Sequence, residues 1–271
     1  MQTKMTLKRW IENRERSGLP CFSHGDVASA FPSASTNALY SALSRFCKSK
    51  RILAVHRGFY CVIPAHYALS GEVPPFYYIG QLMTWLGKPY YAALLTAASM
   101  WGASHQKIMV AQIMTRLPHS SFSVLKNHSI DWIYRKRMPE EFIVVRNGET
   151  GPVRFSNAEL TALDLVRYAD QSGGLPFVTD VLGELRESTD FTGAAEGVFR
   201  TADMADIQRM GYIFDAVLQD SGQAEVIRSE MMRLGRTIRP VPLSPGGVGP
   251  ILGENQKWRI RVNMTLGEEE Q

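Results

Sequence analysis

The most constraining feature of the sequence is a basic tip between two apolar runs, placed directly after an amphipathic segment. Residues 51–64, RILAVHRGFYCVIP, carry these two runs on either side of His56, Arg57 and Gly58. Apolar runs joined through a glycine predict a β-hairpin, because glycine readily adopts the positive φ that a tight turn needs. Residues 36–50 before it have the apolar spacing of a helix. The chain must therefore place a hairpin with a cationic tip beside a helix.

Two further helices are expected upstream. Residues 7–17 show helical apolar spacing and are stopped by Gly18. Ser23 with Asp26 three residues later predicts the start of a short second helix, in the manner of a capping box, and Pro32 closes it. Helix, short helix, turn, helix and hairpin is the order of a winged helix-turn-helix.

The third helix would present a polar outer face to a ligand. Leu39, Leu43 and Phe46 follow i, i+4 and i+7 and are expected to pack inward. Short hydrogen-bonding side chains near a helix start can reach base edges, and cations at its end and on a wing can contact phosphates. The candidate DNA-binding residues are Ser35, Thr36, Asn37, Tyr40, Ser41, Ser44, Arg45, Lys48, Lys50, His56 and Arg57.

The charge distribution supports this prediction. The whole chain has a formal net charge of +4. Residues 1–64 hold ten basic and three acidic side chains, a net charge of +7, and the remaining residues carry −3. A basic module joined to a mildly acidic one is typical of a phosphate-binding unit with a partner domain. A solvated basic surface, or a winged helix that binds protein instead of DNA, would give the same pattern.

Cysteine usage and hydropathy point to a soluble protein of the cytoplasm. Cys21, Cys47 and Cys61 are odd in number and lack CxxC spacing, so we expect buried thiols in a reducing compartment and no zinc site. The N-terminal residues lack the apolar region of a signal peptide, and the apolar residues 90–101 are too few to span a bilayer. No membrane association is expected.

The rest of the chain alternates helical and strand patterns, so the predicted fold class is α+β. Asn147-Gly148 predicts a hairpin turn, and Ser156 with Glu159 predicts a capping box at a helix start. The expected helices are residues 78–86, 90–101, 156–173, 175–186, 203–219 and 223–234. The expected strands are residues 107–114, 129–134, 142–145, 152–156 and 258–264.

Three regions are expected from these patterns. Residues 1–70 would form the winged helix-turn-helix DNA-binding domain. Residues 75–235 would form a mixed domain of helices and a small sheet. Residues 236–271 would contain a Pro/Gly loop, a terminal strand and a tail.

Enzyme chemistry has little support in the sequence, and neither a cofactor nor a metal is expected. The six histidines are scattered, and the glycines of PGGVGP lack the Lys-Ser/Thr of a phosphate-binding loop. Asp164 is expected to be exposed or to have a partner in the core. Asp180 and Glu184 lie one helical turn apart and could hold Mg²⁺, although such pairs are more often solvated. A metal-dependent nuclease delivered to DNA by the winged helix is the alternative function.

Four segments in this order resemble the AbiEi-like antitoxins of type IV toxin-antitoxin, or abortive-infection, systems. They are SALSRFCKSKRILAVHRGFYCVIP, PYYAALLTAASMWGASHQ, FSNAELTALDLVRYADQSGGLPFVTDVLGEL and RMGYIFDAVL, and the similarity covers roughly residues 6–220.

The resemblance implies a non-enzymatic antitoxin with two activities. Its winged helix would repress its own operon by binding inverted repeats in double-stranded DNA. Its C-terminal domain would neutralise a nucleotidyltransferase-like toxin for phage defence, in many cases without a stable complex. Leu160 stands where the family often has Arg, which argues against a charged pair there. The wing residues carried over from the family are His56, Arg57, Gly58, Phe59 and Tyr60.

Overall fold

The structure is a computed structural model with mixed α and β content, as expected, and it forms two compact units. It describes residues 5–103, 110–117, 129–247 and 249–267, without the side chains of residues 194–196. Unit 1 comprises Met1–Tyr90, Ile113–Lys136 and Val145–Arg154, and unit 2 comprises Tyr91–Gln112, Arg137–Val144 and Phe155–Gln271. Among the described helices, none combines the length and apolarity needed to cross a lipid bilayer.

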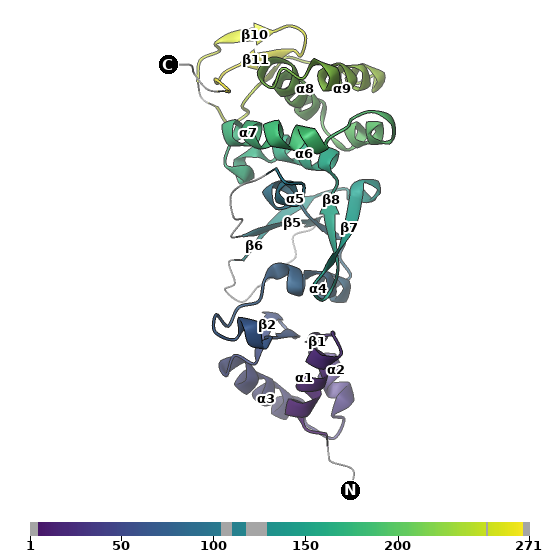
Figure 1. Cartoon of the computed structure of the whole chain (residues 1–271), viewed down its shortest axis with the longest axis vertical. Coiled ribbons are helices and arrows are strands. Elements are labelled where there is room, and N and C mark those ends of the chain that lie inside the picture. Colours follow the sequence, from purple (N-terminus) through teal and green to yellow (C-terminus); the bar gives the residue numbers. More distant parts are fainter. Residues whose placement is uncertain (1–4, 104–109, 118–128, 248, 268–271) are drawn as a thin grey trace. The chain divides into compact units, whose positions relative to one another are not determined.

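The chain begins with three helices and a three-stranded sheet in unit 1 (Figure 1). The sheet has the order β1-β3-β2, and both pairings are antiparallel. The predicted helices and hairpin are confirmed, whereas the short strand β1 was not predicted. The elements are α1 (Leu7–Arg16), β1 (Cys21–Ser23), α2 (His24–Ala30), α3 (Thr36–Lys48), β2 (Ile52–His56) and β3 (Phe59–Val62).

A single apolar cluster holds these elements together. Leu39 and Leu43 of α3 pack with Ile11 of α1 and Val27 of α2. Phe22 of β1 also belongs to the cluster. Burying side chains of this size stabilises the module by about 1.5–3 kcal/mol each before entropy is subtracted. The predicted capping box is confirmed, because the Ser23 side chain accepts from Asp26 N and the Asp26 side chain accepts from Ser23 N.

A five-stranded sheet has the order β6-β5-β4-β8-β7, and β4 is parallel to β8. Before it, α4 (Ile79–Leu86) ends at Gly87 in a left-handed conformation. The strands are β4 (Tyr90–Ala92), β5 (Ala111–Arg116), β6 (Ile130–Arg135), β7 (Ile143–Gly148) and β8 (Gly151–Ser156). Part of the strand expected at residues 107–114 lies outside the described residues.

The helix predicted over residues 90–101 is wrong in its first third. Tyr90–Ala92 form β4, and helix α5 (Leu94–Met100) begins only after Ala93. The amide of Ala93 donates to the carbonyl of Gln112 at 2.9 Å. Burial in a sheet therefore overrides the helical preference of an Ala- and Leu-rich segment.

Two local predictions in this region also need correction. The β7–β8 turn consists of Glu149 and Thr150 instead of Asn147-Gly148. Thr150 Oγ1 donates to the Tyr77 carbonyl at 2.5 Å. This bond holds the turn at Glu149 and Thr150, two residues further along the chain than predicted.

The expected capping box of Ser156 and Glu159 is absent from the described residues. Asn157 is the N-cap of α6 (Ala158–Arg167), and its side chain accepts from the amide of Leu160. Ser156 instead shares a buried 2.7 Å hydrogen bond with Thr161, and Glu159 Oε1 accepts from the amide of Asp190 at 2.9 Å.

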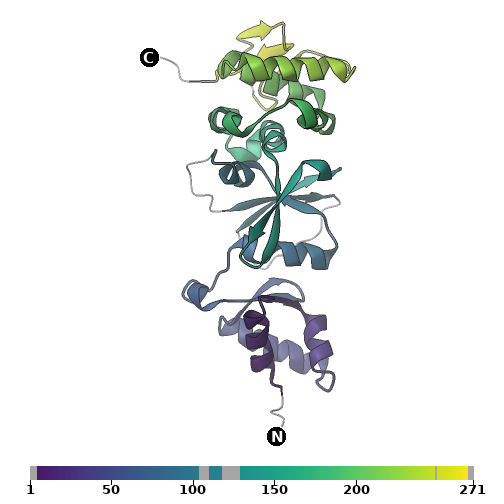
Figure 2. The same cartoon turned by 45° about the vertical axis from the view of Figure 1, so that its right-hand side comes forward.

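Unit 2 is mainly helical, and in it α6 contacts α5, α7 and α8 (Figure 2). Helix α8 continues into a π-helical turn, so the helix predicted over residues 203–219 changes type partway. The further elements are α7 (Leu175–Leu185), α8 (Met204–Tyr212), the π turn (Ile213–Val217), α9 (Ser221–Arg233), β9 (Val241–Pro242), β10 (Gly253–Asn255) and β11 (Ile260–Val262).

The segment after α9 is anchored on α8 by one large side chain. Trp258 is fully buried, and its indole Nε1 donates to Asp215 Oδ2 at 2.8 Å. Gln208 Nε2 donates to the carbonyls of Arg239 and Trp258, both at 2.9 Å. A β-carbon at Gly211 would lie 2.0 Å from the Trp258 ring. Gly211 is therefore required for the indole to reach α8.

We predict that Gly211→Ala destabilises unit 2 by about 1–3 kcal/mol or more, because the added methyl group overpacks the Trp258 site. Thermal unfolding of the full chain measures this loss. Gly246→Ala is the matched control, since a β-carbon there meets nothing within 4 Å. An equal unfolding temperature for the two variants would contradict the packing of Trp258 on α8.

Candidate nucleic-acid interface

The outer face of α3 displays the polar residues that the sequence singled out. The helix buries Leu39 and Leu43, and its other face is open to solvent. Ten of the eleven candidates are exposed, and the exception, His56, is half-buried. The exposed residues are Ser35, Thr36, Asn37, Tyr40, Ser41, Ser44, Arg45, Lys48, Lys50 and Arg57.

Ser35 has a structural role at the start of α3. It is the N-cap, and its Oγ accepts from the amide of Ala38 at 3.3 Å. Such a cap contributes about 1 kcal/mol. Thr36 and Asn37 follow in the first turn of the helix, where side chains can reach a groove beside the helix terminus.

Tyr40 is held by a residue that sequence reasoning missed. The ring of His24 stacks on the ring of Tyr40 with centroids 4.0 Å apart and 19° between the planes. The amide of His24 donates to the carbonyl of Gly58, at the tip of the hairpin, at 2.8 Å. His24 therefore links the start of α2, the outer face of α3 and the β2–β3 turn. No spacing rule relates these residues, so only the fold reveals the contact.

The side chain of His24 keeps one unused hydrogen-bonding atom. Its Nε2 is buried and has no hydrogen-bond partner among the described residues. The 23–26 capping box fixes the backbone next to it. The imidazole is thus positioned by stacking and by its backbone, which leaves Nε2 for a ligand or a water molecule.

The candidate cations fall into two groups. Arg45 and Lys48 lie in the last turn of α3, where they also complement the negative end of the helix dipole, and Arg57 is exposed at the hairpin tip. Lys50 has a φ of 53°. Its side chain lies against Gly71, where an added β-carbon would approach its Cδ to 2.8 Å.

His56 is turned toward α4 instead of standing free on the hairpin. Its ring meets Trp85 edge-on at 5.6 Å, and Phe59 of the returning strand lies 5.2 Å from the same indole. Among the candidate cations, Arg45, Lys48, Lys50 and Arg57 are therefore exposed, and His56 is half-buried.

The cysteines have the packing role that their spacing suggested. Cys21 and Cys61 are buried and lie opposite each other in the β1–β3 register, and Cys47 is half-buried. All three are free thiols. Burial, followed by the neighbouring Cys21, raises the pKa of the Cys61 thiol well above its ordinary value. The neutral thiol therefore persists at physiological pH.

The acidic residues considered for catalysis are separated. Asp164 is buried and accepts a 2.7 Å hydrogen bond from Tyr91 Oη, so it has a partner in the core. Asp180 and Glu184 are exposed on α7. Across the residues that the structure describes, no three His, Cys, Asp or Glu side chains gather in a way that could hold a metal ion.

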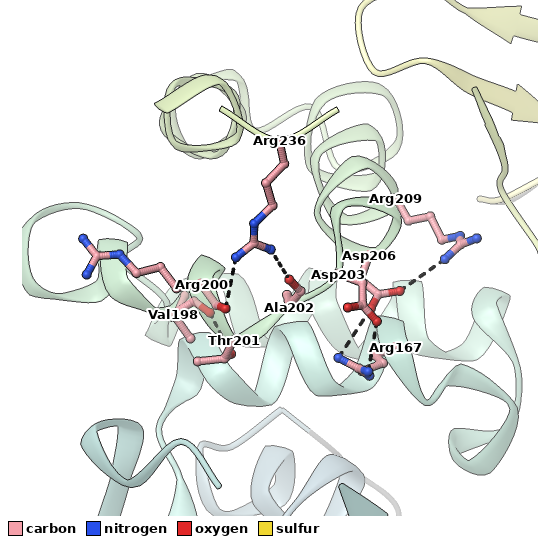
Figure 3. A network of polar contacts seen from close by, with 9 residues as sticks. All are labelled: Arg167, Val198, Arg200, Thr201, Ala202, Asp203, Asp206, Arg209 and Arg236. Carbon is pink, nitrogen blue, oxygen red and sulfur yellow. Dashed lines mark hydrogen bonds and ion pairs between the residues drawn. The ribbon is translucent and has the colours of Figure 1, made fainter. Parts of the chain in front are cut away.

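A network of charged residues joins the helices of unit 2 (Figure 3). Arg167 of α6 lies 3.0 Å from Asp203 and 4.0 Å from Asp206, and Arg209 lies 3.2 Å from Asp206. Burial raises the pKa of Asp206, and the two guanidinium groups oppose that rise. The network packs α6 against α8.

Arg236 makes a second connection in this unit. Its Nη1 donates to the carbonyl of Ala202 at 2.8 Å and its Nη2 to that of Arg200 at 3.3 Å (Figure 3). Arg209 Nε donates to the Pro242 carbonyl at 3.1 Å. The segment after α9 is therefore held by the helical core of unit 2, and these arginines serve packing.

A comparison with known families gives a match in the middle of the chain. Residues 91–216 match the AbiEi antitoxin C-terminal domain, a stretch slightly shorter than half of the chain. This match supports the resemblance to AbiEi-like antitoxins that the four sequence segments indicated, and with it an antitoxin role in a toxin-antitoxin system. Leu160 is fully buried in the matched region.

The fold also has a counterpart among solved structures. The crystal structure of the RV2827C protein from Mycobacterium tuberculosis superimposes with a TM-score of 0.70, covering 95% of this chain and 91% of that chain at 11% sequence identity. The likeness concerns the fold alone. A comparison with curated proteins gave no match.

Proposed function

We propose that the protein is an antitoxin that binds double-stranded operator DNA through an N-terminal winged helix-turn-helix and represses its own operon. In this proposal α2 and α3 form the helix-turn-helix and the β2–β3 hairpin is the wing. Residues 75–235 counteract a nucleotidyltransferase-like toxin without catalysing a reaction. The operator would contain inverted repeats.

The outer face of α3 is the observation that carries the DNA-binding proposal. Burial of Leu39 and Leu43 orients Thr36, Asn37 and Tyr40 outward together. These side chains offer hydroxyl and amide groups of the kind that read base edges in the major groove. A helix facing another protein would more often display apolar or aromatic anchors at several positions.

Cations beside that face suit the phosphate backbone. Arg45 and Lys48 end α3, and Arg57 extends from the wing. Phosphate contacts from a helix end and a wing would set the position and register of α3 in the groove. The +7 charge of residues 1–64 adds long-range attraction to DNA.

His24 would act as a positioning residue for recognition. Its stack with Tyr40 limits the ring to one orientation. Fixing a side chain before binding reduces the entropy lost on binding. Tyr40 is 48% exposed, so one of its faces stays available to a base or a sugar.

The nuclease alternative gains no support from the described residues. Asp164 is engaged by Tyr91, and the exposed pair Asp180 and Glu184 has no third carboxylate or histidine that could complete a metal site. The AbiEi domain match favours regulation over catalysis.

The first prediction from this proposal concerns phosphate contacts. Arg45→Ala and Arg57→Ala should weaken binding to all duplexes and reduce the slope of log K against log salt by about one unit each. Fluorescence anisotropy with DNA from the region upstream of the gene measures both effects. Arg239→Ala in unit 2 removes the same charge from an exposed site and is the control. Equal slopes in all three variants would refute phosphate binding at α3 and the wing.

A second prediction separates base reading from phosphate binding. His24→Ala should release Tyr40 and lower the ratio of operator to nonspecific affinity, whereas His24→Phe should preserve the stack and most of that ratio. Asn37→Ala should cost about 1–3 kcal/mol for one base pair of the operator. Parallel titrations with operator and scrambled duplexes give the ratio. If His24→Ala changed both affinities equally, the positioning role would be wrong.

A third prediction tests the antitoxin activity independently of DNA. The full chain carrying both Asn37→Ala and Arg57→Ala should lose repression and still restore growth when a nucleotidyltransferase encoded in the same operon is expressed. Expression of both proteins from a foreign promoter removes autoregulation from the assay. Failure of the unaltered chain to restore growth would contradict the proposed target.

A further inference from the structure

Unit 1 contains a cavity that the proposed DNA interface does not use. Its volume is about 510 Å³, within the range of about 300–1,000 Å³ that is usual for small-molecule sites. Described residues from β1, α2, β3, α4 and the β7–β8 hairpin line it. A site of this size has room for a small organic molecule.

Aromatic rings form much of the wall. Phe22 and Phe59 are 1% and 4% exposed, and Trp85 is 43% exposed. The rings of Phe59 and Trp85 are tilted by 31° with centroids 5.2 Å apart. Such a wall favours a flat aromatic ligand, because rings prefer stacked or edge-on contacts with other rings.

Two of the described lining residues are charged. Arg154 is half-buried and is the cation among the described lining residues, and its Nε donates to the carbonyl of Tyr90 at 3.2 Å. The acid, Asp26, is exposed and already accepts from the amide and hydroxyl of Ser23 at 2.7 and 2.9 Å. A half-buried guanidinium beside aromatic rings suits an anionic group on the ligand.

Tyr90 supplies an unused polar atom at the same wall. Its side chain is 4% exposed, and its hydroxyl has no hydrogen-bond partner among the described residues. Gly80 lies beside it, since an added β-carbon would be 3.3 Å from the Tyr90 hydroxyl and 2.9 Å from the Pro152 carbonyl. Buried hydroxyls are normally paired, so this atom marks a place where an acceptor from a ligand or a water molecule would fit.

We propose that this cavity is a binding site for a small aromatic carboxylate or a similar aromatic anion, and that its occupancy alters the affinity of the protein for DNA. Arg154 pairs with the anionic group, and the Tyr90 hydroxyl donates a hydrogen bond to the ligand. The rings of Phe22, Phe59 and Trp85 contact its aromatic body.

The coupling to DNA rests on the proposed function of the N-terminal module. Phe22 directly precedes the capping box of α2, and Phe59 begins the strand after the wing tip. His24, two residues after Phe22, bonds the wing at Gly58 and stacks on Tyr40. A ligand in the cavity therefore contacts residues next to those that position α3 and the wing. If the ligand binds free and DNA-bound protein with different affinities, it changes the affinity for DNA by the same factor.

Isothermal titration calorimetry of the full chain with 1-naphthoate tests the site. We expect saturable one-to-one binding that Thr84→Phe weakens at least tenfold, because Thr84 is an exposed residue of α4 that lines the cavity. Glu225→Phe on the exposed face of α9 is the matched control and should bind as the unaltered protein does. No saturable binding, or equal affinity in both variants, would overturn the proposal.

The charge requirement has its own test. The neutral analogue 1-naphthalenemethanol should bind at least tenfold more weakly than 1-naphthoate, and Arg154→Gln should remove that preference. Equal binding of the two compounds to the unaltered protein would refute the assignment of an anion.

The regulatory part is measured by DNA anisotropy with and without 1-naphthoate. We expect a shift in operator affinity that Thr84→Phe abolishes and Glu225→Phe keeps. An unchanged affinity at saturating ligand would overturn the coupling. Absence of any DNA binding before ligand is added would instead contradict the proposed function, and calorimetry would still decide the ligand site.

Discussion

Burial of one face of α3 is the constraint on which the N-terminal module depends. Leu39 and Leu43 are buried together in a cluster that includes Ile11, Phe22 and Val27. This packing sets the rotation of α3 about its own axis. The direction of each side chain on the outer face follows from that rotation, because every Cα–Cβ bond leaves the helix at a fixed angle. The polar surface is thus a consequence of the core.

Unit 2 depends on a different packing contact, that of Trp258 with Gly211. Its last segment reaches the helical core through Trp258, which occupies the space left by the missing side chain of Gly211. The AbiEi match ends at residue 216, before this segment. The additional residues therefore complete the packing around α8 instead of forming an independent tail. Arg209 and Arg236 strengthen the same attachment through backbone carbonyls.

The sequence predicts features that arise from local periodicity and fails where distant segments decide. The helix over residues 36–48 was predictable because its apolar spacing and its cap lie within one segment. The three residues of β1 and of β4 were not, since each gains its strand geometry from a partner elsewhere in the chain. The exposed candidates of α3 follow from its periodicity. The stack of His24 on Tyr40, and the contact of His56 with Trp85, depend on the tertiary structure and leave no mark in the spacing.

The bond from the His24 amide to the Gly58 carbonyl has a mechanical consequence. It connects the hairpin tip to the beginning of α2, so movement of the tip away from the helices would break this bond. If this module binds a duplex, the bond favours one distance between the hairpin tip and α2. The DNA would then have to deform to match this distance, and the deformation free energy depends on the DNA sequence. Sequences whose groove width already matches would be favoured, even at base pairs that the protein does not contact.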